Sequence, residues 1–377
     1  MTAILQSKDS VSGAVLYMAL ELSNKRWKLG FSNGERQRQV SIEAGDWIGL
    51  NEQIVRAREK LGLAADCRIV SCYEAGRDGF WIHRSLVDQG IENVVLDSAS
   101  IEVNRRQRRA KSDKVDVKAL LRLLQRYWQG ERGMLSVVRV PTVEEEDQRR
   151  LHRERERLLK ERGSHSARIK SLLVAHGLRL QVGADFLHQL EVARGGLGYA
   201  LGSDLKAELA REYERYRVVD EQIRGLEAEQ KARAQAGLGD ALEQVNRLMQ
   251  LRSVGWQSSW VLVMEFIAWR AFRNQRQVAA CAGLTPTPYS SGDSEREQGI
   301  SKAGNRRVRT LMIELSWLWL RYQPGSVLRQ WFQRRFAGGG KRMRRIGIVA
   351  LARKLLIALW RYVTDGVIPE GAVLKAV

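Results

Sequence analysis

The sequence predicts three parts in order: an α/β domain over residues 1–140, a helical coiled-coil region over 141–240 and a mainly α-helical domain over 241–377. Strand patterns alternate with helix patterns in the first part. Composition changes at Pro141, after which Glu, Arg, Leu and Lys dominate and strand-forming residues are almost absent. Gly237-Leu238-Gly239 then ends a second long helical pattern. A length of 377 residues exceeds the usual single-domain size, in agreement with several compact parts.

The first part begins with an antiparallel meander over residues 15–42. Its three short strands are VLYMALEL, RWKLGF and RQRQVSI, separated by the turn residues Ser23-Asn24 and Ser32-Asn33-Gly34. Helix and strand patterns follow in turn: a helix over 46–61, a strand over 68–73, a helix over 80–89, a strand over 93–96 and a helix from about Lys114. This order predicts a mixed sheet covered by helices.

Two long helices are predicted in the middle part, over 142–177 and 203–233. The second has apolar residues at steps of three and four, the spacing of a coiled-coil seam: Leu205, Leu209, Tyr213, Tyr216, Val219, Ile223 and Leu226. Such helices pack either as an antiparallel hairpin within one chain or against another chain. An ordinary helical core and a dimer interface are equally good explanations of the pattern.

The charge balance predicts a polyanionic partner. Lys and Arg outnumber Asp and Glu by 63 to 43, which gives a net charge of +20 and a pI near 10.2. The basic residues are spread through folded-looking segments, which favours nucleic acid over an anionic membrane surface. Three cysteines without CxxC spacing exclude a disulfide framework or a zinc site, and the apolar run 311–320 is too short to cross a bilayer. We therefore expect a cytoplasmic protein that does not bind membranes.

Four carboxylates stand out by their positions: Glu21, Glu74, Asp113 and Asp116. Glu21 lies inside the first strand pattern, Glu74 follows a buried strand, and the two aspartates are three residues apart at the start of a helix. Such residues can converge at one edge of a sheet, where two Mg²⁺ ions would activate an attacking oxygen and stabilise a leaving oxygen in phosphoryl transfer. Taken singly, each acid is better explained as a solvated surface charge or a helix cap, and only the set of four favours a metal site.

Three segments resemble the DEDD-class transposases of insertion sequences, the one-ten family and especially its one-triple-one branch, which includes relatives of the Piv DNA invertase. The segments are CYEAGRDGFWIHR (72–84), VVLDSASIEVNRRQRRAKSDKVDVKALLRLL (94–124) and AGLTPTPYSSGDSEREQGISKAGNRRVRTL (282–311). The resemblance implies an RNase H-like, RuvC-type fold for the α/β domain, with Glu21, Glu74, Asp113 and Asp116 as catalytic metal ligands. One position departs from the family: it usually has aspartate where Glu21 stands, and glutamate reaches one methylene further.

The same resemblance implies that Ser291, within Tyr289-Ser290-Ser291-Gly292, is a catalytic nucleophile that forms a phosphoserine with DNA. Without the flanking motif, a polar turn would be the favoured explanation of SSGDS. Some members of the family are guided by a structured RNA encoded by their own element, so a bridge RNA that pairs with donor and target DNA is expected here. Because DNA exchange involves two ends and four strand cuts, we expect a dimer or tetramer, acting at the bacterial nucleoid.

Basic residues near both predicted catalytic segments are candidates for nucleic-acid binding. One group precedes the two aspartates: Arg105, Arg106, Arg108, Arg109 and Lys111. Two further groups follow the serine motif: Lys302, Arg306, Arg307 and Arg309, and then Lys341, Arg342, Arg344 and Arg345. Solvated basic loops remain the alternative explanation.

Two other functions fit the same residues. A RuvC-like, metal-dependent junction nuclease would use the carboxylates with water as the nucleophile and would form no covalent intermediate. A degenerate nucleic-acid-binding protein would result if Glu21 had abolished metal binding. A covalent protein–DNA adduct separates the transposase from the first, and strand exchange separates it from the second.

Overall fold

The computed structural model describes residues 14–98, 101, 113–236, 239–291 and 294–375. The chain forms two compact units, Met1–Pro141 and Thr142–Val377, each described here by itself. The helices of the middle part and of the C-terminal part belong to the same unit. No helix in the described ranges combines the length and the apolar character needed to cross a membrane.

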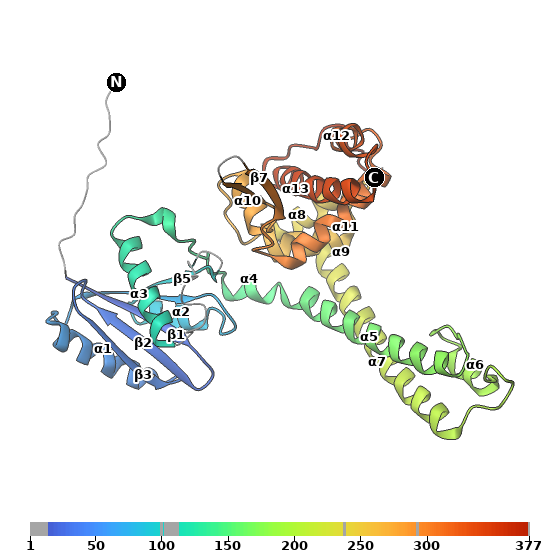
Figure 1. The fold of residues 1–377 in the computed structure, drawn as a ribbon, viewed down its shortest axis with the longest axis horizontal. Helices are drawn as coiled ribbons and strands as arrows, with labels where there is room; N and C mark the ends of the chain where they lie inside the picture. Colours follow the sequence, from blue (N-terminus) through green and yellow to red (C-terminus); the bar gives the residue numbers. More distant parts are fainter. Residues whose placement is uncertain (1–13, 99–100, 102–112, 237–238, 292–293, 376–377) are drawn as a thin grey trace. The chain divides into compact units, whose positions relative to one another are not determined.

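A five-stranded sheet forms the centre of the first unit (Figure 1), in the order β3-β2-β1-β4-β5. The strands are β1 (Val15–Leu22), β2 (Arg26–Ser32), β3 (Gln37–Glu43), β4 (Arg68–Glu74) and β5 (Glu92–Leu96). β1, β2 and β3 pair antiparallel, which confirms the predicted meander, whereas β4 pairs parallel with both β1 and β5. The first predicted strand has the bounds of β1, and each of the other four differs from the observed strand by one residue at one or both ends.

Helices cover both faces of this sheet. On one face, α1 (Trp47–Leu61) and α2 (Trp81–Asp88) pack against alternate residues of β1, including Leu16 and Met18. On the other face, α3 (Asp113–Trp128) packs against Tyr17 and Ala19. Because side chains alternate along a strand, the next residue of β1 on the α3 face is Glu21.

The direction of α3 follows from two contacts with β2. Gln125 Nε2 donates a hydrogen bond to Ser32 Oγ at 2.8 Å, and Ser32 pairs with Tyr17 near the start of β1. A Cβ atom on Gly30, which pairs with Ala19, would lie 2.7 Å from Leu121 Cδ1. Earlier residues of α3 therefore lie over later residues of β1. The N-terminus of α3 points toward the end of β1 that carries Glu21.

An antiparallel helical hairpin begins the second unit. The helix predicted over 142–177 is two helices, α4 (Val143–Asp147) and α5 (Arg150–Ala175), interrupted at 148–149. The second predicted helix is α7 (Ser203–Ala236), which lies beside α5 (Figure 1). Leu158 of α5 packs with Val219 and Ile223 of α7, so this part of the seam is used within the chain. The short α6 (Phe186–Val192) packs against α7 at the far end of the hairpin.

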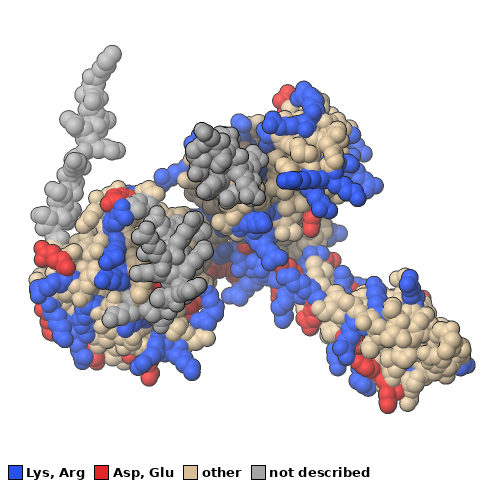
Figure 2. All heavy atoms as spheres, viewed as in Figure 1, with Lys and Arg blue, Asp and Glu red and all other residues tan. Residues whose placement is uncertain are grey.

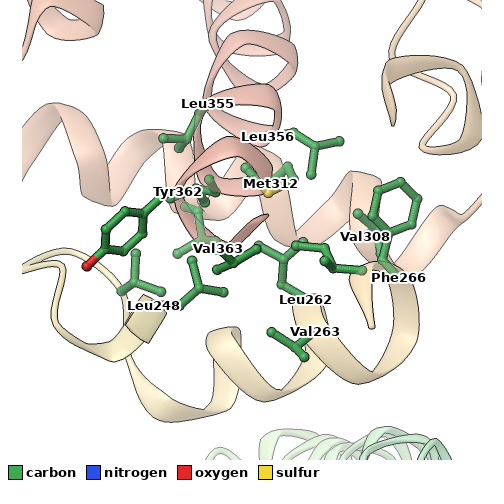
Figure 3. Close-up of a cluster of buried hydrophobic side chains, with 14 of the residues drawn as sticks. Leu248, Leu262, Val263, Phe266, Val308, Met312, Leu355, Leu356, Tyr362 and Val363 are labelled. Atoms are coloured by element: carbon green, nitrogen blue, oxygen red, sulfur yellow. The ribbon is translucent and has the colours of Figure 1, made fainter. Parts of the chain in front are cut away.

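The rest of the second unit surrounds a large apolar core. It comprises α8 (Asp240–Met249), α9 (Trp256–Leu262), a π-helix (Val263–Ile267), α10 (Gln275–Cys281), β6 (Pro286–Ser291), β7 (Ser294–Ile300), α11 (Arg306–Tyr322), α12 (Val327–Phe336) and α13 (Lys341–Asp365). Figure 3 shows side chains from five of these helices meeting in the core: Leu248, Leu262, Val263, Phe266, Val308, Met312, Leu355, Leu356, Tyr362 and Val363. The hairpin of β6 and β7 was not predicted from the sequence.

Candidate functional site

Glu21 and Glu74 lie at the same edge of the sheet. Each follows the last residue of a parallel pair, Leu20 opposite Tyr73, at the carboxyl end of its strand. By alternation both belong to the α3 face, because Ala19 and Cys72 pack there. Both also line one hollow of about 660 Å³, together with 22–25 and 75–78. Two carboxylates distant in sequence are thus neighbours in the fold.

The two aspartates of α3 lie one helical turn before its buried residues. Asp113 precedes Val117 by four residues and Asp116 precedes Leu120 by four, which places both positions on the side of α3 that faces the sheet. Oδ2 of Asp116 is buried and has no hydrogen-bond partner within the described part of the chain. The side chain of Asp113 lies outside the described residues.

Within the described residues, no group of three or more His, Cys, Asp or Glu side chains lies close enough to hold a metal ion. Glu21 and Glu74 share the hollow, but Asp116 does not line it. The basic residues Arg105, Arg106, Arg108, Arg109 and Lys111, predicted to bind phosphate, lie outside the described residues.

Ser291 is the last residue of β6, and its backbone pairs with Ser294 of β7. The side chains of 288–298 lie outside the described residues, so the structure places the backbone of Ser291 and not its hydroxyl. Ser291 and Ser294 therefore form the last described pair of a β-hairpin whose second strand is followed by α11.

The base of this hairpin, residues 301–305, packs backbone to backbone against residues 281–285 at the end of α10. Three backbone N–H groups donate to carbonyls of 281–285: Asn305 to Cys281 at 2.7 Å, Ser301 to Thr285 at 2.9 Å and Lys302 to Gly283 at 3.2 Å. Gly283 and Gly304 both have positive φ, 67° and 101°. A Cβ atom on either would lie within 2.3 Å of a carbonyl oxygen of the other segment, so only glycine fits.

A buried glutamate that sequence reasoning missed lies beneath this base. Glu265 belongs to the π-helix and is 2% exposed. Its carboxylate accepts hydrogen bonds from His152 Nε2 at 2.8 Å, from Arg153 at 2.8 and 2.9 Å, and from Asn305 Nδ2 at 2.9 Å. The sequence signal was one acid within the apolar run VLVMEFIAW.

The hydrogen bonds around Glu265 keep it charged. Burial by itself would raise the pKa of Glu265, but the hydrogen bonds from His152 and Arg153 outweigh burial and hold the pKa well below its usual value. Nearby, the guanidinium groups of Arg149 and Arg270 lie 4.6 and 3.8 Å from the ring centre of Trp269. Burial lowers the pKa of Arg270 to about 10.

The basic residues of the second unit divide into two kinds. Arg307 makes an ion pair with Glu156 of α5, and Arg309 donates to the carbonyl of Ala282 at 3.1 Å, so both also support the fold. Lys302 and Arg306 are exposed. Lys341, Arg342, Arg344 and Arg345 are exposed in the first turns of α13, and Figure 2 shows Lys and Arg side chains gathered over the region of α12 and α13.

Comparison with known proteins gives two kinds of match. The sequence model described as "Transposase IS116/IS110/IS902 family" matches residues 245–331. The y4rJ protein of Sinorhizobium fredii (strain NBRC 101917 / NGR234), whose name assigns it as a transposase, is 43% identical over 377 residues. That alignment covers 96% of this chain and 94% of the relative. The chain belongs to this transposase family.

Transposases of two further insertion sequences are similar over much of this transposase. That of IS1111A from Coxiella burnetii (strain RSA 493 / Nine Mile phase I) is 28% identical over 285 residues, covering 75% of this chain and 74% of the relative. That of IS1328 from Yersinia enterocolitica is 25% identical over 261 residues, covering 68% and 73%. The segment matched by the family model contains Ser291, Glu265 and Asn305, whereas the carboxylates of the first unit lie outside it.

Proposed function

We propose that this transposase cuts and rejoins DNA through a covalent phosphoserine at Ser291, with Glu21, Glu74, Asp113 and Asp116 as the ligands of two Mg²⁺ ions. The observation that carries the proposal is the placement of Glu21 and Glu74 at the ends of neighbouring parallel strands, lining one hollow on the face covered by α3. The order β3-β2-β1-β4-β5, with a helix starting in an acidic pair across that face, supports an RNase H-like, RuvC-type fold for this unit.

The donor set fits Mg²⁺ in its chemistry. Carboxylate oxygens are the ligands that this hard cation prefers, and the buried, unpaired Oδ2 of Asp116 in the described structure is the kind of group that a cation satisfies. When bound, Mg²⁺ would supply charge stabilisation for the oxygens that gain negative charge at the phosphorus. Glu21, Glu74, Asp113 and Asp116 would hold the ions.

The serine step balances without an external energy source. The Oγ–P bond forms as the P–O bond to one DNA strand breaks, and the serine proton passes to a base or to the leaving oxygen. A hydroxyl at a new DNA end then displaces the serine, so one phosphodiester is exchanged for another without net hydrolysis. The stiff base of the β6–β7 hairpin suits this role, because a nucleophile must be held in a fixed geometry.

Guidance by a structured RNA and assembly as a dimer or tetramer belong to the same proposal. The net charge of +20 and the exposed cations of α13 support binding to nucleic-acid backbones, with sequence recognition left to base pairing. Exchange of two DNA ends requires four strand cuts, which favours several chains acting together.

A metal-dependent junction nuclease is the second candidate. It is favoured by one observation: the carboxylates and Ser291 belong to different compact units, and carboxylates with Mg²⁺ are sufficient for attack by water. A protein that only binds nucleic acid is the third, if the longer side chain of Glu21 prevents metal binding.

The deciding experiment uses labelled DNA carrying the ends of the element, Mg²⁺ and any co-purifying RNA. We expect a covalent protein–DNA adduct with the native chain and with Ser290→Ala, and none with Ser291→Ala or Asp116→Asn. Cleavage that needs Mg²⁺ but leaves no adduct would establish the nuclease. Binding without cleavage in the native chain would establish the binding protein.

A further inference from the structure

Glu265 joins three segments of the second unit that are far apart in the sequence. His152 and Arg153 come from the first turn of α5, Glu265 from the π-helix and Asn305 from the start of α11. A carboxylate only accepts hydrogen bonds, so His152 Nε2, Arg153 and the amide of Asn305 all donate to it. Such a set of charge-assisted bonds in a buried place fixes all the partners at once.

Asn305 links Glu265 to the β6–β7 hairpin. Its Oδ1 accepts from Val308 N at 3.1 Å and caps α11, while its own N–H donates to Cys281. The neighbouring bond from Ser301 N goes to the carbonyl of Thr285, the residue immediately before β6, and the last residue of β6 is Ser291. A π-helix, which often marks a functional segment, supplies the glutamate.

We propose that Glu265 is a positioning residue that, by holding Asn305 against the start of α5, fixes the base of the β6–β7 hairpin and so the place of Ser291. This proposal rests on the proposed function of Ser291 as the nucleophile. Glu265 does not touch the reacting atoms. Its removal lets the hairpin base shift relative to α5, and a displacement of about 1 Å is enough to slow a reaction about 100-fold.

Glu212 provides a matched control. It is 6% exposed, accepts from His165 Nδ1 at 2.6 Å and from Arg215 at 2.8 Å, and joins α5 to α7. Glu212→Gln therefore removes a buried carboxylate paired with a histidine and an arginine, as Glu265→Gln does, but it leaves Asn305 in place. A merely structural role predicts the same kinetic effect for both variants.

The experiment measures adduct formation at increasing DNA concentrations. We expect Glu265→Gln to lower the rate at saturating DNA by about 10- to 100-fold, with the half-saturating concentration unchanged, whereas Glu212→Gln leaves both unchanged. Asn305→Asp keeps the helix cap but places two carboxylates together, and it should slow the reaction similarly. The double variant Glu265→Gln/Asn305→Asp restores a donor–acceptor pair between the two positions. Its rate at saturating DNA should be about tenfold higher than that of Glu265→Gln alone.

Amide hydrogen exchange of β6 and β7 provides a readout that does not need catalysis. Exchange there should rise in Glu265→Gln and stay unchanged in Glu212→Gln. Equal effects of the two variants on rate and exchange would overturn the proposal, as would an unchanged rate and unchanged exchange in Glu265→Gln. If the native chain forms no adduct while exchange still separates the variants, the phosphoserine mechanism is wrong and the positioning role stands.

Discussion

Gln125 donates a hydrogen bond to Ser32 over 2.8 Å, and this contact sets which end of α3 meets the carboxyl edge of the sheet. With Gln125 near the start of β1, the first turn of α3 lies toward the end of β1. Asp116 and Glu21 thereby come to the same edge although 95 positions separate them in the chain.

Asp116→Asn should abolish activity and at the same time raise the stability of the fold. Oδ2 of Asp116 is buried without a hydrogen-bond partner among the described residues, so this oxygen costs free energy when no metal is bound. We expect Asp116→Asn to abolish Mg²⁺-dependent adduct formation and to raise the thermal unfolding temperature in chelator. A lowered unfolding temperature would mean that the carboxylate supports the fold itself. Asp66→Asn, on an exposed loop, is the control and should change neither quantity.

Gly304→Ala should lower the free energy of unfolding far more than an alanine substitution at another glycine with positive φ. Gly304 and Gly366 both have positive φ, 101° and 74°, but only at Gly304 would a Cβ meet backbone, 2.3 Å from the carbonyl oxygen of Cys281. We expect Gly366→Ala to lower the free energy of unfolding by about 1 kcal/mol and Gly304→Ala by about 3 kcal/mol or more. Denaturant unfolding of the two variants measures both values; equal losses would show that this backbone contact can open without strain.

The stability of the second unit should fall in acid, partly because of Glu265. Its pKa is lower in the folded chain than the ordinary value near 4. A group of this kind stabilises the fold above its ordinary pKa, and that stabilisation is lost as the pH falls toward the folded-state pKa. Glu265→Gln should therefore be less stable than the native chain at pH 7 and should lose less stability between about pH 4 and pH 2. The exposed Glu243→Gln is the control, whose acid unfolding should follow that of the native chain.

The cations of α13 should contribute to the salt dependence of nucleic-acid binding. Lys341, Arg342, Arg344 and Arg345 are all exposed. Replacing the four with alanine should reduce the slope of log affinity against log salt by about 0.9 for each phosphate contact removed. A variant that removes four exposed cations of the helical hairpin, Arg157, Lys170, Arg211 and Lys231, has the same net charge and should keep the native slope. Equal slopes for the two variants would show that only net charge matters.

Much of the first unit could be predicted from the sequence because its signals are local. The alternation of apolar residues in VLYMALEL and the turns after it predict β1 and the meander, and the structure confirms them. The same alternation predicts which face Glu21 belongs to. Gly283 and Gly304 gave no such signal in the sequence, because their role depends on the carbonyls of Ala303 and Cys281, which lie 20 and 23 positions away.

By itself, the sequence determined the strands of the sheet, the long helices of the hairpin and the family, since each depends on short-range periodicity or on a contiguous motif. Only the tertiary structure decided that α3 crosses the sheet toward Glu21, that Ser291 ends the first strand of a β-hairpin and that Glu265 holds His152 and Asn305 together. The polar strand SEREQGI has no apolar alternation to mark it. The partners of Glu265 lie 113 and 40 positions away, and such pairs are set by how packed helices meet.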